Sequence, residues 1–378
     1  MRLLISAGLF YPSKLGGPSK SLYWLAKGLI SKGFNISVVT SNNFINKGLV
    51  EFDEWTIVDD IRIMYCSTKT NFSFKITWNT IKEIKNCDIV ILSSIFYKPS
   101  FFIALYTLFT TKKLVWSPRG ELYYNAIRGS IIKKLYIKIL RFLFSRKVIF
   151  HATSLDEENN IKRHFGFNTQ VFVIPNYMEL PEKQKRICNS DKFLLYVGRI
   201  APIKALDNVL IGLLNSKAFM KSDCRFLIAG SVEEQFHWFN EKLNKIIQND
   251  KSLKNKVLFL GNVEDSEKYK LFAEAYFTIL VSHSENFGNV VIEALSQGTP
   301  VIASKGTPWQ KLKLNDAGFW IDNDVNSIAK QIDEILKLDN NRYKQIRENA
   351  FNLAKEFDIH TNIDKWINIL NNYVNTSR

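Results

Sequence analysis

The sequence predicts an α/β protein of two doubly wound domains, each a parallel sheet covered by helices on both faces. Three observations support this prediction. The chain has 378 residues, which is enough for two domains. Short apolar runs alternate twice along the chain with longer helical patterns, as is typical of parallel sheets. A polar stretch with two prolines, residues 175–191, separates the two series and is predicted to be the linker.

The two series of apolar runs and helical patterns predict where the strands and helices lie. Leu22, Leu25 and Leu29 recur at helical spacing and predict a helix over residues 19–32. The short apolar runs predict strands over residues 3–7, 35–40, 89–93, 114–117 and 147–152, and then over 193–197, 225–229, 257–260, 277–281 and 301–303. The predicted domains are 1–178 and 179–358. The C-terminal residues 359–378 are expected to pack back on the first domain as a helix. Ligands of such sheets bind beyond the carboxyl ends of the strands, so the site is expected in a cleft between two facing domains.

Charge and cysteines narrow the function classes. The net charge is +15, and residues 1–180 hold 24 Lys and Arg against 12 Asp and Glu. Such a basic half suits an anionic partner, which leaves nucleic acid, a membrane or a phosphorylated substrate open. The cysteines stand far apart without a CxxC pair, which predicts reduced thiols in a cytosolic protein and argues against zinc: Cys66, Cys87, Cys188 and Cys224. The longest uncharged apolar stretch, residues 99–109, is about half of a membrane span and is predicted to be a buried helix.

The strongest functional signal is a pair of carboxylates, Glu285 and Glu293, separated by seven residues. A helix is predicted from Asn289, and its N-terminus can bind a diphosphate without a metal. Gly288 would let a ligand approach the backbone closely. Glu293 could accept hydrogen bonds from a ribose diol, and Glu285 could hold hydroxyls of a transferred sugar. Two solvated carboxylates are the alternative, but the helix around Glu293 is apolar, and a buried carboxylate needs a partner.

Two further motifs could hold phosphate. A predicted strand ends at Gly198 and is followed by Arg199 and Lys204, two cations that could stabilise the charge of a departing diphosphate. Solvated surface cations are the alternative. Gly16 and Gly17 precede a helix and could cradle phosphate through backbone N–H groups, although a plain loop is equally compatible. The motif is not GxGxxG and no acidic residue ends the second strand, which argues against a nicotinamide cofactor.

A basic and strongly apolar helix is predicted within residues 126–149. Lys134, Lys138 and Arg141 share one helical stripe, which suits an anionic membrane surface, with residues 131–147 as the contact. An ordinary core helix with a solvated cationic side is the alternative. Three residues near predicted strand ends are candidates for contacting an acceptor or sugar: Arg119, Glu121 and His283. His151 is predicted to be packed or solvated rather than catalytic.

Together these motifs resemble retaining glycosyltransferases of family 4, also called glycosyl transferases group 1, of the polysaccharide or O-antigen assembly type. That family has the GT-B fold of two Rossmann-like domains. Its signature is similar to the pair Glu285 and Glu293, and its phosphate-binding pair to Arg199 and Lys204. The other similar positions are Gly16, Gly17, 173–176, Gly230, 261–263 and 298–301. These motifs run from residue 3 to about residue 305 in chain order.

The resemblance implies transfer of a hexose or N-acetylhexosamine from a nucleotide-diphosphate sugar, preferably a UDP-sugar, with retention of configuration and without metal or cofactor. It implies donor binding by the second domain and acceptor binding by the first. The leaving phosphate would itself accept the proton of the acceptor. The implied catalytic residues are Arg199, Lys204 and Glu285. The implied donor-binding residues are Gly16, Gly17, Gly198, Gly230, Asn262, Val263, Asn286, Phe287, Gly288, Asn289 and Glu293.

The resemblance also implies a saccharide acceptor, often lipid-linked, at the cytoplasmic face of a membrane. Two positions depart from the family pattern, since Arg119 stands where the family often has His and Ala205 where Gly is common. Three alternatives stay open: a GDP-mannose-dependent mannosyltransferase, a sugar-nucleotide epimerase of the same fold, and a basic nucleic-acid-binding protein, against which the lack of any reader motif argues.

Overall fold

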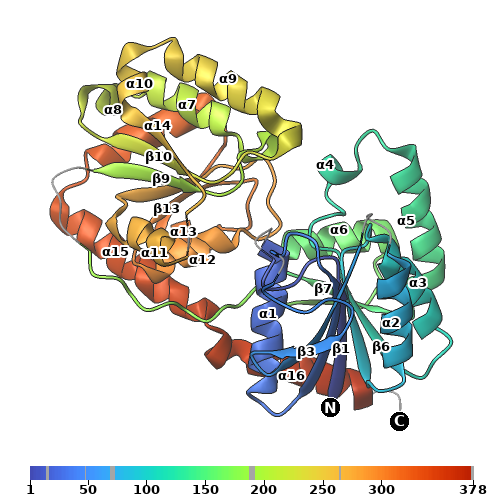
Figure 1. Cartoon of the computed structure of the whole chain (residues 1–378). Helices are drawn as coiled ribbons and strands as arrows, with labels where there is room; N and C mark the ends of the chain where they lie inside the picture. Colours follow the sequence, from blue (N-terminus) through green and yellow to red (C-terminus); the bar gives the residue numbers. More distant parts are fainter. Residues whose placement is uncertain (14–16, 47, 69–72, 187–191, 264, 376–378) are drawn as a thin grey trace. The chain divides into compact units, whose positions relative to one another are not determined.

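The computed structural model describes residues 1–13, 17–46, 48–68, 73–186, 192–263 and 265–375. The chain divides into two compact units, shown in Figure 1. Unit 1 combines Met1–Glu179 with Asp358–Arg378, and unit 2 is Leu180–Phe357. The C-terminal helix α16 (Ile359–Asn375) therefore belongs to unit 1.

The described strands of unit 1 form one sheet in the order β3-β4-β2-β1-β5-β6-β7-β8, parallel except for β3 against β4. The strands are β1 (Arg2–Ala7), β2 (Asn35–Ser41), β3 (Trp55–Val58), β4 (Ile61–Cys66), β5 (Ile89–Ser93), β6 (Lys113–Ser117), β7 (Ile149–Ala152) and β8 (Val171–Val173). The chain passes from β1 to β2 on one side and from β5 to β6 on the other side. The topological switch point of this sheet therefore lies between β1 and β5.

The helices of unit 1 cover both faces of this sheet. They are α1 (Gly17–Ile30), α2 (Phe74–Ile84), α3 (Lys98–Thr107), α4 (Tyr124–Ile127), α5 (Ile131–Phe144) and α6 (Leu155–Phe165). Right-handed crossovers place α1 on one face and α2, α3, α5 and α6 on the other. Helix α16 packs on α1, where a Cβ on Gly28 would lie 2.7 Å from Ile359 Cγ1, so the missing side chain permits the close approach.

Unit 2 has a parallel sheet in the order β11-β10-β9-β12-β13-β14. Its strands are β9 (Phe193–Val197), β10 (Arg225–Ala229), β11 (Val257–Gly261), β12 (Phe277–Leu280), β13 (Val301–Ser304) and β14 (Gly318–Ile321). Its helices are α7 (Leu206–Asn215), α8 (Lys217–Lys221), α9 (His237–Gln248), α10 (Lys251–Lys256), α11 (Asp265–Glu274), α12 (Asn289–Ser296), α13 (Lys311–Leu314), α14 (Val325–Leu336) and α15 (Asn340–Ala354). The switch point lies between β9 and β12, because the order runs one way from β9 to β11 and the other way from β12 to β14.

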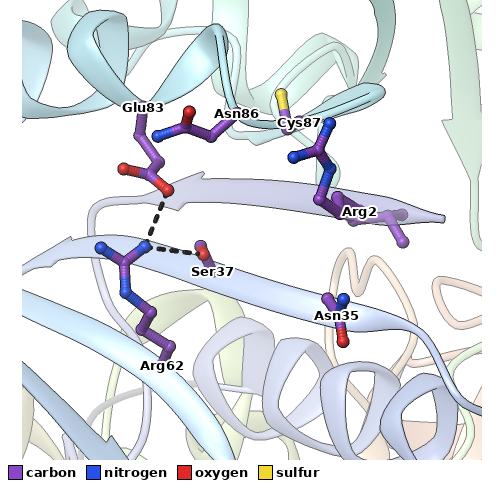
Figure 2. A pocket seen from close by; sticks show the side chains of 8 residues that line it. Arg2, Asn35, Ser37, Arg62, Glu83, Asn86 and Cys87 are labelled. Atoms are coloured by element: carbon purple, nitrogen blue, oxygen red, sulfur yellow. Dashed lines mark hydrogen bonds and ion pairs between the residues drawn. The ribbon is translucent and has the colours of Figure 1, made fainter.

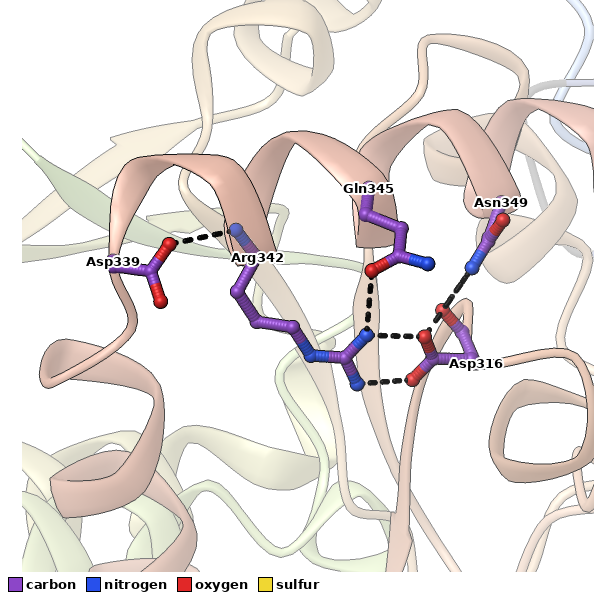
Figure 3. A network of polar contacts seen from close by, with 5 residues as sticks. All are labelled: Asp316, Asp339, Arg342, Gln345 and Asn349. Carbon is purple, nitrogen blue, oxygen red and sulfur yellow. Dashed lines mark hydrogen bonds and ion pairs between the residues drawn. The ribbon is translucent and has the colours of Figure 1, made fainter.

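A polar network ties α15 to the turn before β14 (Figure 3). Asp316 holds a left-handed backbone conformation with a φ of 50°. Arg342 on α15 donates to both of its carboxylate oxygens at 2.5 Å, and Asn349 Nδ2 donates to its carbonyl oxygen at 3.2 Å. Asp339 caps α15 by accepting from the Arg342 N–H. The strained turn and the helix therefore stabilise each other.

The structure corrects two sequence predictions. Helix α3 is exposed on its outer side, with Phe102 45% and Tyr106 43% accessible, so the prediction of a buried helix over residues 99–109 is wrong. An all-round apolar sequence does not indicate which side faces the core. The second correction concerns bounds: the helix predicted within residues 126–149 is present as α5, but it spans only Ile131–Phe144, because Gly129 has a φ of 80° and Ser130 caps the helix. Among the described residues, no helix is both long and apolar enough to cross a membrane.

Candidate active site

The candidate site of unit 2 lies at the carboxyl ends of β9 and β12, on either side of the switch point. The loop after β9 carries Arg199 and Lys204, and the loop after β12 carries Glu285. The two loops contact each other, because the backbone N–H of His283 donates to the carbonyl oxygen of Ile203 at 2.9 Å. Ligands of doubly wound sheets bind at such an edge.

An ion pair joins the two loops. Lys204 Nζ donates to Glu285 Oε2 at 2.5 Å, and the two side chains are only 14% and 19% exposed. The Ser282 hydroxyl donates to the same oxygen at 3.1 Å. The backbone N–H of Glu285 donates to Gly306 O at 2.9 Å, which fixes the loop from a third side. The structure thus brings two of the predicted catalytic residues into direct contact.

Arg199 turns toward a different neighbour. Its Nη1 donates to Glu233 Oε1 at 2.6 Å, and Glu233 belongs to the loop after β10. Tyr196 positions the same turn, because its hydroxyl donates to the carbonyl oxygen of Arg199 at 2.6 Å. Burial raises the pKa of Tyr196, and the negative charge of Glu285 adds to the effect. Glu233 is not predicted from the sequence, although its place just after a predicted strand end is a usable signal.

The turn after Lys204 explains one departure from the family pattern. Ala205 has a φ of 54° and a ψ of 36°, which is the left-handed region. An L-residue there costs roughly 1–2 kcal/mol relative to glycine. Glycine is therefore the easier residue at this position, and alanine keeps the same turn at an energetic cost.

Two glycines allow the strand ends to approach each other. Gly198 and Gly230 end neighbouring strands, with φ values of 153° and 151°. A Cβ on Gly230 would lie 1.8 Å from the carbonyl oxygen of Gly198. Glycine at position 230 is thus required for this edge of the sheet, whatever it binds.

Replacing Gly230 with alanine is therefore expected to lower the free energy of unfolding by about 3 kcal/mol or more, because backbone atoms would have to move apart. Urea unfolding of the purified variant measures this loss. Gly261→Ala is the matched control, since Gly261 also has a positive φ but nothing lies within 4 Å of its Cβ position. The control should lose only about 1 kcal/mol. Equal losses in both variants would contradict the contact.

The second carboxylate of the motif, Glu293, lies inside unit 2. Helix α12 begins at Asn289, and Gly288 caps it with a φ of 84°. Glu293 accepts from Lys268 Nζ of α11 at 2.8 Å, and both residues are buried. Lys268 is thus the partner that a buried Glu293 is predicted to need. Lys268 itself is not predicted from the sequence, because nothing in the sequence indicates that α11 packs on α12.

The other predicted donor residues are spread along the same edge. The Phe287 ring is buried against Trp309, whose Nε1 donates to the Phe287 carbonyl oxygen, so only the backbone of Phe287 could reach a ligand. Asn262 and Val263 follow β11, at the edge of the sheet and two strands from β9. Asn286 and Asn289 flank the Gly288 turn.

His283 is held by a side chain from another loop. Its Nδ1 lies 2.7 Å from Nδ2 of Asn323, which follows β14. If the amide donates, Nε2 carries the proton of the neutral ring and can donate to a hydroxyl or phosphate. Asn323 was not predicted from the sequence.

The predicted residues of unit 1 have defined partners. Glu121 accepts hydrogen bonds from Ser94 Oγ and from the N–H groups of Ile95 and Phe96, at 2.5–2.9 Å, and so holds the segment before α3. Burial raises its pKa, and these hydrogen bonds oppose the effect. This is a structural role, and its contact with an acceptor stays a prediction. Gly17 begins α1, whereas Gly16 lies outside the described residues.

Arg119 follows β6 with a left-handed φ of 57°. Its Nη1 donates to Asn176 Oδ1 at 3.0 Å, and its Nε has no hydrogen-bond partner among the described residues. Burial lowers its pKa to about 10, opposed by the negative charge of Glu157. A small cavity adjoins it, lined also by Ser21, His151 and Tyr177. A strained, incompletely paired cation at a strand end remains a candidate contact for an anionic or hydroxyl group.

His151 is packed in the core of unit 1. Its Nε2 lies 2.9 Å from Ile174 O and its Nδ1 lies 2.8 Å from the Ser117 hydroxyl. Burial, with the charge of Arg119, lowers its pKa to about 3. The imidazole is therefore neutral, and it donates through Nε2.

The neutral His151 predicts a pH dependence of stability. In the unfolded chain its pKa is about 6.5, so from pH 7 to 5.5 the unfolded state binds a proton that the folded state does not. The free energy of unfolding should fall by about 1.3 kcal/mol over this window. Urea unfolding at both pH values measures the drop, which should be correspondingly smaller in His151→Gln. An equal drop in both proteins would contradict the assignment.

A separate polar cavity of about 290 Å³ lies at the opposite, amino-terminal edge of the unit 1 sheet (Figure 2). There Arg62 Nη1 donates to Glu83 Oε1 at 2.7 Å and to Ser37 Oγ at 3.1 Å. Arg62 thus pairs with a carboxylate of the same surface, and the cavity is remote from the carboxyl ends of the strands.

The described residues contain no group of three or more His, Cys, Asp and Glu placed to hold a metal ion. Cys66, Cys87 and Cys224 are buried and unbonded to one another, and burial raises their pKa values to about 11, 12 and 12. Cys188 lies outside the described residues.

Two family models match consecutive parts of the chain. The model described as Glycosyltransferase Family 4 matches residues 15–180. The model described as Glycosyl transferases group 1 matches residues 179–353. The boundary between them falls where unit 1 passes into unit 2.

Proteins with similar sequences are also glycosyltransferases. The chain is 25% identical over 281 residues to the poly(glycerol-phosphate) alpha-glucosyltransferase of Bacillus subtilis, over 71% of this chain and 39% of that protein. It is 28% identical over 161 residues to the O-antigen chain mannosyltransferase B of Escherichia coli, over 42% of this chain and 41% of that protein. The matches thus span less than half the length of each relative.

Among solved structures, the Anabaena protein HepE in complex with UDP and glucose superposes with a TM-score of 0.79 at 18% identity, over 98% of this chain and all of that one. This likeness shows a shared fold. Two doubly wound units, matched in chain order by the two models, establish that the chain belongs to the group 1, family 4 glycosyltransferases and has their GT-B fold.

Proposed function

We propose that the protein is a retaining glycosyltransferase that moves a hexose or N-acetylhexosamine from a UDP-sugar to a saccharide acceptor in cell-surface polysaccharide biosynthesis. The observation that carries the proposal is the contact between Lys204 and Glu285 at the switch point of unit 2. It holds a cation and a carboxylate where a nucleotide sugar would lie in a doubly wound sheet. Unit 2 would bind the donor, and unit 1 the acceptor.

The proposed chemistry assigns distinct tasks to the charged groups. The bond between the sugar C1 and the phosphate oxygen breaks as the bond from C1 to the acceptor oxygen forms on the same face. The proton of the acceptor hydroxyl passes to the leaving phosphate. Arg199, Lys204 and the N-terminus of α12 would stabilise the charge that develops on the diphosphate. Glu285 would orient Lys204 and hold sugar hydroxyls, while Glu293 would hold the ribose.

These groups supply positive charge without a metal ion, so transfer is expected to survive EDTA. The measurement is release of nucleoside diphosphate from the donor in 5 mM EDTA and in added Mg²⁺ or Mn²⁺, with about twofold or smaller differences expected. Strict dependence of the rate on added divalent metal would contradict the metal-free part of the proposal.

We propose a lipid-linked acceptor and a peripheral position on the cytoplasmic face of the plasma membrane. The support is α5 and the residues that follow it, since 131–147 combine exposed cations with exposed apolar side chains. Such a helix suits an anionic membrane surface. The core-helix alternative accounts for its buried side, Ile137, Leu140 and Phe144.

The donor base is the least constrained part of the proposal. A UDP complex of the similar structure HepE favours UDP-sugars, while the relation to an O-antigen chain mannosyltransferase supports GDP-mannose as the second candidate. A donor screen with membranes as acceptor source, reading release of UDP or GDP, separates the two. An epimerase would convert the donor without forming a glycoside, and a nucleic-acid-binding protein would release neither nucleotide. Either result would overturn the transferase assignment.

A further inference from the structure

Three neighbouring helices of unit 1 leave large apolar side chains exposed on one side. Helices α2, α3 and α5 lie on the same face of the sheet, and α2 packs on α3 (Figure 1). The ring of Phe101 on α3 lies 5.9 Å from that of Tyr136 and 6.3 Å from that of Phe144, which joins α3 to α5. The exposed side chains are Phe74, Trp78, Phe102, Tyr106, Phe109, Ile131, Ile132, Leu135, Ile139 and Phe142. We name this set the apolar face.

Each helix points these side chains away from the sheet. On α2, Phe74 and Trp78 are one turn apart with their rings stacked at 6.0 Å, and Ile76 on the other side is fully buried. On α3, Phe102 and Tyr106 are likewise one turn apart. On α5, Ile131 and Phe142 are more than 80% exposed. Large exposed apolar side chains that gather on neighbouring helices in this way mark an interaction site.

Cations predominate around the α3 and α5 part of the apolar face, whereas Glu83 of α2 pairs with Arg62 and Asp156 lies in the first turn of the neighbouring helix α6. Residues 89–155 contain a single acidic residue, Glu121, and its carboxylate accepts hydrogen bonds inside unit 1. Lys134, Lys138 and Arg141 are exposed on α5 among the apolar side chains. On α2, Lys82 Nζ lies 5.1 Å from the centre of the Trp78 ring. The occupant of this surface must therefore be both apolar and anionic.

We infer that the whole apolar face, and not α5 alone, docks on an anionic lipid bilayer, with the aromatic side chains of α2 and α3 entering the interface beside α5. Tyr and Trp favour this depth, and lysine stems extend their charges toward headgroups. A second copy of the chain is disfavoured, because two such cationic surfaces would repel each other. Nucleic acid is disfavoured on α5, where the exposed apolar side chains other than Phe142 are aliphatic and offer bases no stacking surface. The inference rests on the proposed function only for the location of the acceptor.

Flotation with vesicles of 30% phosphatidylglycerol and 70% phosphatidylcholine tests the docking on the full-length protein. Replacing Lys134, Lys138 and Arg141 together with glutamine is expected to weaken binding about 100-fold, at roughly fivefold for each cation. Replacing Phe102 and Tyr106 together with serine is expected to weaken it about tenfold. The control replaces Lys245, Lys251 and Lys254 of unit 2, which are equally exposed, and should bind as the wild type.

Tryptophan fluorescence tests the depth of α2. Brominated phosphatidylcholine in the same vesicles should quench the wild type, and Trp78→Phe should lose a distinct part of that quenching. Trp238→Phe should lose none, since Trp238 is similarly exposed but belongs to unit 2. Binding that depends on the α5 cations without quenching of Trp78 would overturn the three-helix docking.

Three further outcomes would contradict docking of the apolar face on an anionic bilayer. The inference fails if the wild type does not float with anionic vesicles, if it forms a dimer that Phe102→Ser splits, or if DNA displaces it from vesicles at equal phosphate concentration. Release of nucleoside diphosphate from the donor in vesicle-free solution should be unchanged in all these variants. A variant that no longer binds vesicles but still releases nucleoside diphosphate therefore contradicts neither the proposed transferase activity nor its site. If the wild type releases no nucleoside diphosphate, only the proposed function is contradicted.

Discussion

Replacing Lys204 with alanine is expected to lower kcat for transfer by about 10²–10³-fold, the usual loss when one fixed donor to a developing charge is removed. Lys204 lies at the carboxyl end of β9, and its amine is held at 2.5 Å from Glu285. The loss should fall mainly on kcat, because charge on the diphosphate increases in the transition state. Steady-state release of nucleoside diphosphate measures it.

Two controls separate catalysis from folding. Lys242→Ala removes a lysine from another ion pair of unit 2, 2.6 Å from Asp207 on the surface, and should leave kcat unchanged. Urea unfolding of Lys204→Ala should show a native-like transition. Full activity in Lys204→Ala would contradict the catalytic role of Lys204.

Replacing Glu293 with alanine is expected to destabilise unit 2 by about 3–5 kcal/mol, because it removes the carboxylate that pairs with the buried ammonium of Lys268. The burial of the pair makes stability, and not transfer alone, the quantity that this variant changes. Thermal and urea unfolding measure the loss. A fully stable variant would contradict the burial of the pair.

A double variant keeps the functional question answerable. Glu293→Gln combined with Lys268→Met removes both charges, so most of the stability should return. Binding of the donor should nevertheless stay at least about tenfold weaker if Glu293 holds the ribose, since a carboxylate accepts two hydrogen bonds from a diol. Donor affinity equal to the wild type would give Glu293 a purely structural role.

The sequence predicts the parallel strands well, because buried strands read as short, continuous apolar runs. The strands β3, β4, β8 and β14 are not predicted, and β3, β8 and β14 are short strands at a sheet edge. β8 has three residues, β14 begins with a glycine, and β3 with β4 forms a hairpin around Asp59 and Asp60, both with left-handed φ values. Local conformation of this kind is not visible in periodicity.

The residue types of the site follow from the sequence, but their partners do not. Glu285 and Lys204 are 81 residues apart, and only the strand order that places β9 beside β12 brings them together. The same holds for Glu293 with Lys268 and for Arg199 with Glu233. A single sequence indicates which side chains follow strand ends, and tertiary structure decides which of them meet.

The most direct test of the account is the binding of UDP to the full-length protein by calorimetry, compared with uridine. In the proposed site the diphosphate lies against Arg199, Lys204 and the N-terminus of α12. It predicts that UDP binds about 100-fold or more tightly than uridine, and that Arg199→Ala with Lys204→Ala removes most of this difference. A double variant that keeps the full preference for UDP would show that the diphosphate binds elsewhere.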